Sequence, residues 1–174
     1  MMKNGFSLSL LLVIAFMGSA LSGELVPKHE LAAHAITLEV AHELHARFGL
    51  EPLALGGSMM TTIDGFALTL RTYKPLSVEQ ARACVLDCVD TYLQKINANA
   101  ELQPYLKEKP FTAKGLTLQF LVLDQNDLFK SQSSLANFYL DKGKIVYNKC
   151  NLQTGLLEKV QEELYDQVAS KPKL

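Results

Sequence analysis

The chain has 174 residues, of which 48% are hydrophobic, and its 17 basic and 18 acidic side chains give a formal net charge of −1. This proportion of apolar residues supplies a core and argues against an intrinsically disordered chain. Charges of both signs are interspersed along the sequence, so we expect no basic face and no binding of nucleic acid.

The first 22 residues have the pattern of a secretory signal peptide. Lys3 precedes an apolar run from about Phe6 to Met17, and the small residues of GSALSG follow. The run is shorter than the roughly 20 residues of an ordinary transmembrane helix. We expect residues 1–22 to be removed and the protein to be exported, periplasmic or secreted, with no membrane span left; an uncleaved N-terminal anchor is the alternative. Residues 23–174 have the size of a single domain.

Residues 28–48 are predicted to form a helix, because apolar side chains recur on one side and Gly49 can end it. The apolar stripe contains Ala33, Val40, Ala41, Leu44 and Phe48. Strict alternation around Phe66, Leu68 and Leu70 then indicates a half-buried strand. A shorter strand with Leu53 and Leu55 is expected before it, broken by Gly56 and Gly57.

A second helix is predicted from Val78 to about Ala98, opened by the capping-box pair Ser77 and Gln80. A central strand follows from Gly115, and residues 135–150 read as a hairpin. A last helix is expected from near Thr154, on the apolar spacing of Leu157, Val160, Leu164 and Val168. The predicted fold is α+β in the order α-β-β-α-β-β-β-α, a mainly antiparallel sheet of about five strands packed with three helices.

The three cysteines are Cys84, Cys88 and Cys150. The first two are four residues apart inside the predicted second helix, unlike the C-x-x-C redox pair at a helix N-terminus. Their side chains run parallel on adjacent turns, which is a poor geometry for a disulfide between them. Two interpretations stay open: a disulfide from Cys88 or Cys84 to Cys150, or free cysteines packed as small apolar side chains.

All four histidines lie in the predicted first helix. His42 and His45 are one turn apart and form the weak candidate pair for a metal, without the H-E-x-x-H spacing. We expect a solvated helix edge, no metal and no cofactor. Ser58 follows two glycines but is not in a G-x-S-x-G elbow, so no catalytic residue is predicted.

Arg82 is a candidate binding residue, since it lies near the apolar stripe of the predicted second helix. Its guanidinium either reaches solvent while its stem packs, or pairs with a buried carboxylate or an anionic ligand.

The segment after this helix has the pattern N-x-N-x-x-L-x-P-Y-L followed by P-F-T. Its residues are Asn97, Asn99, Leu102, Pro104, Tyr105, Leu106, Pro110, Phe111 and Thr112. With LSVEQAR at 76–82, residues 64–123 resemble small exported bacterial proteins of unknown function; the resemblance implies a helix, an ordered loop and a strand, and no activity. Tyr105 and Phe111 are large apolar groups between prolines, so we expect the loop to be packed down; a partner-binding surface is the alternative.

We expect an exported binding or interaction module without catalytic activity, whose partner is a protein or a small ligand. The alternative is a small exported hydrolase or thiol-dependent enzyme with a site assembled across the fold; a purely structural envelope protein is a third possibility. A pocket holding a histidine beside a cysteine, Ser58 or a carboxylate would favour the enzyme. An apolar groove or an exposed sheet edge would favour binding.

Overall fold

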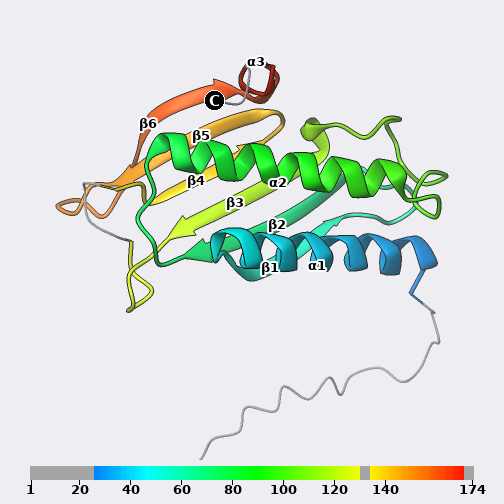
Figure 1. The fold of residues 1–174 in the computed structure, drawn as a ribbon, viewed down its shortest axis with the longest axis horizontal. Coiled ribbons are helices and arrows are strands. Elements are labelled where there is room, and N and C mark those ends of the chain that lie inside the picture. Colours follow the sequence, from blue (N-terminus) through cyan, green and yellow to red (C-terminus); the bar gives the residue numbers. More distant parts are fainter. Residues whose placement is uncertain (1–25, 130–133, 171–174) are drawn as a thin grey trace, which may run out of the picture.

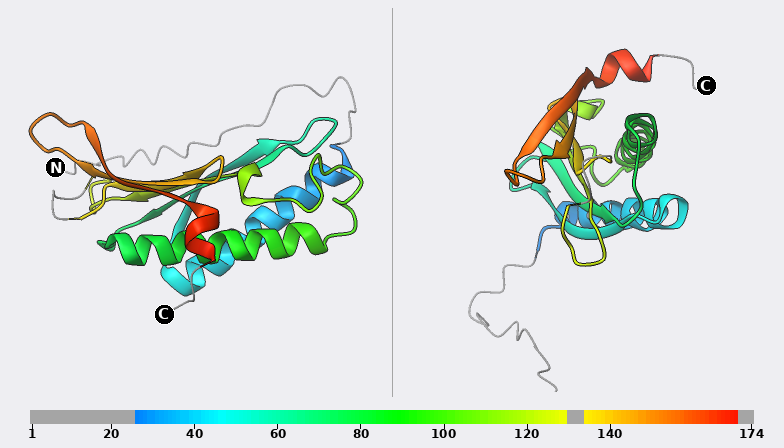
Figure 2. Two further views of the ribbon diagram at one scale, coloured as in Figure 1. Left: turned by 90° about the horizontal axis from the view of Figure 1, so that it is seen from above. Right: turned by 90° about the vertical axis from the view of Figure 1, so that its left-hand side faces the viewer.

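The computed structural model describes residues 26–129 and 134–170, which form two layers. One layer is a six-stranded sheet in the order β1-β2-β3-β4-β5-β6, and the helices cover one of its faces (Figures 1 and 2). Neighbouring strands are antiparallel except β2 and β3, which are parallel. The long helix between these two strands supplies the crossover that a parallel pair needs. The predicted α+β class is therefore confirmed, with six strands instead of five.

The two long helices have the predicted bounds. Helix α1 (Lys28–Phe48) ends at Gly49, which takes the left-handed conformation with φ of 68°. Helix α2 (Val78–Ala98) begins with a complete capping box, in which Ser77 and Gln80 each accept the other's backbone N–H. Local capping and the apolar stripes thus define both helices. In the described ranges, no helix combines the length and the hydropathy of a membrane span.

The strands follow the chain in order. They are β1 (Glu51–Ser58), β2 (Gly65–Thr72), β3 (Leu116–Val122), β4 (Asn137–Asp141), β5 (Lys144–Cys150) and β6 (Leu157–Leu164). A short 3-10 turn (Ala113–Gly115) precedes β3, and β1 continues through Gly56 and Gly57, against the predicted break.

The prediction of a last helix from Thr154 was wrong. Residues 157–164 form the edge strand β6, and only α3 (Tyr165–Ala169) is helical. The pairing of β5 with β6 shifts register between Tyr147 and Asn148, which leaves Val160 as an extra, bulged residue. This bulge spaces apolar residues three and four apart within a strand, as in a helix.

The core lies between the sheet and the helices, and it determines which way each strand residue faces. Ile145 and Tyr147 of β5 belong to this core. Because strand side chains alternate, Val146, Asn148 and Cys150 lie on the opposite face of the sheet, which the helices do not cover.

The possible disulfide from Cys88 or Cys84 to Cys150 is not formed, and all three cysteines are free and buried. Cys84 and Cys88 belong to the core beneath α2, whereas Cys150 lies on the other face of the sheet. The sheet therefore separates Cys150 from both possible partners, and free cysteines packed as small side chains are what the structure has.

Candidate functional site

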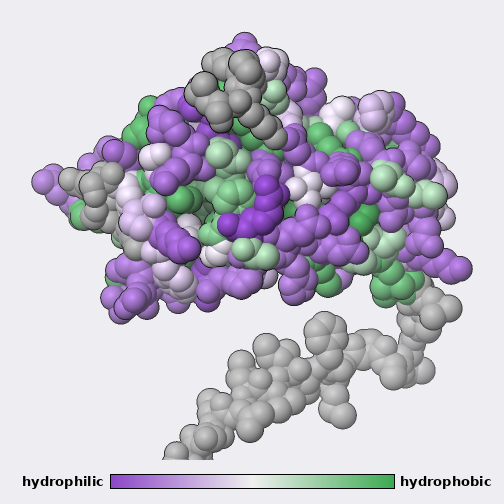
Figure 3. Space-filling model, viewed as in Figure 1, coloured by the Kyte–Doolittle hydropathy of each residue, from purple (hydrophilic) through white to green (hydrophobic). Residues whose placement is uncertain are grey.

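An open groove of about 580 Å³ lies between the N-terminal half of α1 and β1, an edge strand of the sheet. Its lining is mainly apolar. The lining residues are Val26, Glu30, Leu31, His34, Thr37, Leu55, Gly56, Gly57, Met59 and Met60. Figure 3 shows hydrophobic residues gathered at the same end of the molecule, over the start of α1.

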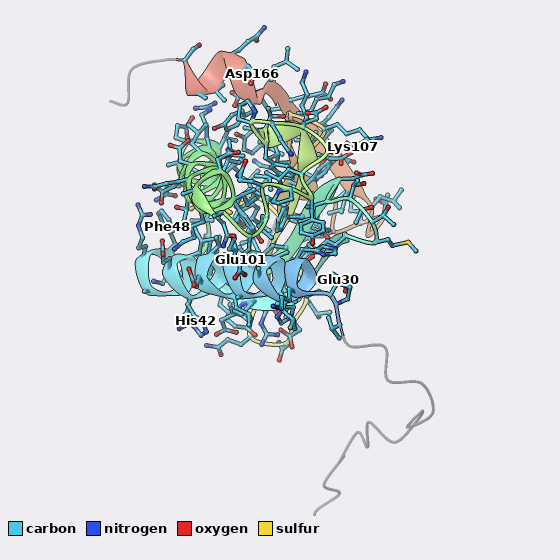
Figure 4. The ribbon with its side chains drawn as sticks, turned by 90° about the vertical axis from the view of Figure 1, so that its right-hand side faces the viewer. Glu30, His42, Phe48, Glu101, Lys107 and Asp166 are labelled. Carbon is cyan, nitrogen blue, oxygen red and sulfur yellow. The ribbon has the colours of Figure 1, made fainter. Side chains whose placement is uncertain are left out.

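Three large apolar side chains of this groove face solvent. Met60 is 86% exposed, Leu31 57% and Val26 54%. Exposed apolar side chains that gather at one concave place mark an interaction surface, whereas single ones are ordinary. Figure 4 looks onto this end of the molecule and shows Glu30 near the first turn of α1.

The strand side of the groove contains Leu55 and two glycines with different surroundings. A Cβ on Gly57 would lie 2.3 Å from Met59 Cε and 2.4 Å from the carbonyl oxygen of Gly65, so the close approach requires glycine. A Cβ on Gly56 would meet no atom within 4 Å. Met59 therefore fills the space beside Gly57, whereas the edge strand is open at Gly56.

His29 holds the end of the groove together. Its Nε2–H donates to the carbonyl oxygens of Met59 at 3.1 Å and Met60 at 3.3 Å, which fixes the tautomer. Its ring stacks on Tyr105, with the ring centroids 4.0 Å apart. His29 therefore ties α1 to the loop after β1 and to the loop after α2.

Sequence reasoning did not assign this role to His29. One signal was available, because His29 lies four residues before Ala33 and thus on the apolar stripe of the helix. Both residues are buried in the structure.

The loop that carries the resemblance is packed down. Phe111 is only 4% exposed, and Leu102 and Leu106 are also buried. Asn97 holds the backbone of Phe111 twice: its Oδ1 accepts from Phe111 N–H at 2.8 Å, and its Nδ2 donates to the Phe111 carbonyl at 3.0 Å. Phe111 is therefore part of the core, and of the two predicted binding residues in this loop only Tyr105, 38% exposed, reaches the surface.

Arg82 lies far from the groove in the sheet order, because it pairs with Glu163 of the opposite edge strand β6. Its Nε donates to Glu163 Oε2 at 2.8 Å, its second nitrogen donates to Oε1, and the Tyr147 hydroxyl donates to Oε2 at 3.1 Å. The hydrogen bonds from Arg82 lower the pKa of the Glu163 carboxyl. Of the alternatives predicted for Arg82, the structure therefore shows the pair with a carboxylate, which belongs to Glu163 of the same chain.

The other candidate residues do not join the groove. Burial raises the pKa of the Cys84 thiol to about 11 and that of Cys88 well above its usual value, so both stay protonated. His42 and His45 are exposed, and His45 Nδ1 lies 3.2 Å from the Leu50 carbonyl oxygen. Within residues 26–129 and 134–170, no group of three or more His, Cys, Asp or Glu side chains is placed to hold a metal ion.

Comparison of the chain with protein-family models, curated proteins and solved structures finds no match. The resemblance to small exported bacterial proteins stays a prediction, and function must be inferred from the site itself.

Proposed function

We propose that this chain is an exported binding protein, without catalytic activity, that holds an extended apolar segment of a partner protein in the groove between α1 and β1. The observation that carries the proposal is the placement of exposed apolar side chains beside an edge strand that is open at Gly56. An edge strand offers backbone hydrogen bonds to an added strand, and a neighbouring helix provides pockets for its side chains.

The composition of the groove favours a range of apolar sequences over one specific ligand. Met59 and Met60 have flexible, polarisable side chains that adapt to differently shaped partners. Glu30 and His34, one helical turn apart, supply the charged and polar contacts of the helical wall. We expect bound segments to carry large apolar residues at alternate positions, since these point to one side of a strand.

The enzymatic alternative has less support. The groove does hold a histidine and a carboxylate, but among the described residues no cysteine and no serine lines it. The two cysteines nearest in chain position, Cys84 and Cys88, are buried in the core as protonated thiols. The one hydroxyl among the lining residues, that of Thr37, is 1% exposed and donates to the Ala33 carbonyl oxygen at 3.0 Å, so it is not presented to a ligand as a nucleophile.

The test is selection of ten-residue peptides from a random library displayed on phage, against the purified chain. We expect the selected peptides to be enriched in large apolar residues. Leu31→Asp should weaken binding of a selected peptide at least tenfold. Burying a leucine side chain contributes about 1.5–3 kcal/mol, and about 1.4 kcal/mol is a factor of ten in affinity.

Leu38→Asp is the matched control. Leu38 lies on the same helix and is 38% exposed, but it does not line the groove. Its replacement should leave the affinity unchanged. Equal losses in both variants, or no enrichment of apolar peptides, would refute the proposal.

A further inference from the structure

Strand β6 forms the edge of the sheet opposite the groove, and its apolar side chains are exposed. Leu157 is 42% exposed, Val160 47% and Leu164 44%. A long edge strand of this kind presents unpaired backbone groups and apolar side chains together, so a second strand is stabilised beside it.

The outer side chains of β6 can be assigned from its pairing with β5. Lys159 pairs with Asn148 and Glu162 pairs with Val146, so both lie on the sheet face that the helices leave uncovered. Leu157 and Leu164 pair with Cys150 and Lys144 and lie on the same face. The bulge at Val160 brings residues of odd and even number onto one face.

We propose that β6 pairs with β6 of a second copy of this chain, antiparallel, about a two-fold axis between Val160 and Gln161. The sequence LEKVQEEL is self-complementary in this register. Lys159 of each copy lies opposite Glu162 of the other, and Leu157 of each lies opposite Leu164 of the other. The two six-stranded sheets then form one continuous sheet.

Charge complementarity selects this register. A shift of two residues in one direction places Lys159 opposite Leu164, and a shift in the other direction places Glu162 opposite Leu157. Only the centred register gives two opposite-charge pairs and two leucine pairs. On the helix face it brings Glu158 opposite Glu163, whose charge Arg82 already balances.

Two features of β6 disfavour pairing with arbitrary strands but are compatible with the one specific partner proposed. A lysine and a bulge on an edge strand disfavour pairing with arbitrary strands. Within one chain, Lys159 Nζ lies 2.9 Å and Lys144 Nζ 3.4 Å from Glu162, so the dimer would extend an existing row of alternating charges. Helix α3, which follows β6, packs back toward α2 through a 3.2 Å hydrogen bond from the Tyr165 hydroxyl to Asp90.

Sedimentation equilibrium of the purified chain measures the association. We expect a monomer–dimer equilibrium that Lys159→Glu weakens at least tenfold, because it places two glutamates opposite each other twice. The double variant with Lys159→Glu and Glu162→Lys should restore dimerisation, since it reverses each pair. Lys107→Glu, at a lysine that is 63% exposed and lies outside β6, is the control for the change in charge.

Cross-linking tests the register. A chain with Lys159→Cys is mixed with a chain with Glu162→Cys, and oxidised. We expect a disulfide-linked dimer only in the mixture, because antiparallel pairing in this register brings these two positions together at a separation that a disulfide spans. Three results would overturn the proposal: a monomer at every concentration, a dimer unaffected by Lys159→Glu, or a disulfide-linked dimer in a sample of one cysteine variant alone. Circular dichroism establishes that each variant is folded.

Discussion

At the scale of single residues, the pair between Arg82 and Glu163 links α2 to the edge strand β6 through two hydrogen bonds. Both side chains are largely removed from solvent, with exposed fractions of 28% and 15%. Hydrogen bonds to charged groups contribute more than neutral ones, about 1.5–3 kcal/mol each. The pair therefore positions the edge strand on the helix layer.

Arg82→Ala should lower the free energy of unfolding at pH 7 by roughly 1–3 kcal/mol. The effect depends on pH because the pKa of Glu163 is lower in the folded chain than its ordinary value of 4.5. The stabilisation is complete above that value and is lost as the pH falls through the lower folded pKa. Urea unfolding of the unaltered chain and of the Arg82→Ala variant should show that the difference between their free energies of unfolding decreases as the pH is lowered.

Glu163→Gln is the control for this pH dependence. The amide keeps a hydrogen-bond acceptor for the Tyr147 hydroxyl, but it removes the titrating group. In the Glu163→Gln chain, Arg82→Ala should lower the free energy of unfolding by less than in the unaltered chain. This decrease should not change with pH. A pH-independent effect of Arg82→Ala in the unaltered chain would contradict this role of Glu163.

At the scale of elements, strand β1 contains two adjacent glycines, of which Gly57 has no room for a side chain and Gly56 does. Gly57→Ala should destabilise the chain by about 1–3 kcal/mol, because the added methyl group overpacks against Met59 and the Gly65 backbone. Gly56→Ala, where a Cβ meets nothing within 4 Å, should be neutral or slightly stabilising. Urea unfolding midpoints of the two variants give the comparison, and equal effects would contradict the close approach at Gly57.

The elements also show where sequence patterns fail. Helices α1 and α2 follow from local signals, the capping box at Ser77 and the glycine at position 49, and their predicted bounds agree with the structure. Strand β6 is composed of good helix formers, and its bulge imitates a helical period. Pairing with β5 decides its conformation, and that interaction is not visible in a short window of sequence.

The groove could not be predicted for a related reason. Its walls come from the start of α1 and from β1, and His29 and Tyr105, which hold it together, are far apart in the sequence. The sequence did provide the parts, namely two glycines, two methionines and the apolar residues of the first helix. Their convergence depends on the sheet topology, which local patterns do not specify.

At the scale of the whole molecule, the two proposed interactions use opposite edges of one sheet. The groove lies at β1 and the proposed self-pairing strand is β6, with four strands between them. Pairing through β6 would leave both grooves free at the two ends of the continuous sheet. The failure of either proposal would therefore leave the other intact.

The mass and the thiol content of the purified protein test the predicted removal of residues 1–22 together with the burial of its cysteines. After secretion from a bacterial host, we expect a chain that lacks residues 1–22 and is found outside the membrane fraction. Because Cys84, Cys88 and Cys150 are free and at most 6% exposed, a thiol reagent should label all three only after denaturation. Mass spectrometry under non-reducing conditions counts the labels and gives the first residue. Fewer than three labels would show a disulfide that the structure lacks, and a membrane-bound chain with its first residues intact would favour the uncleaved anchor.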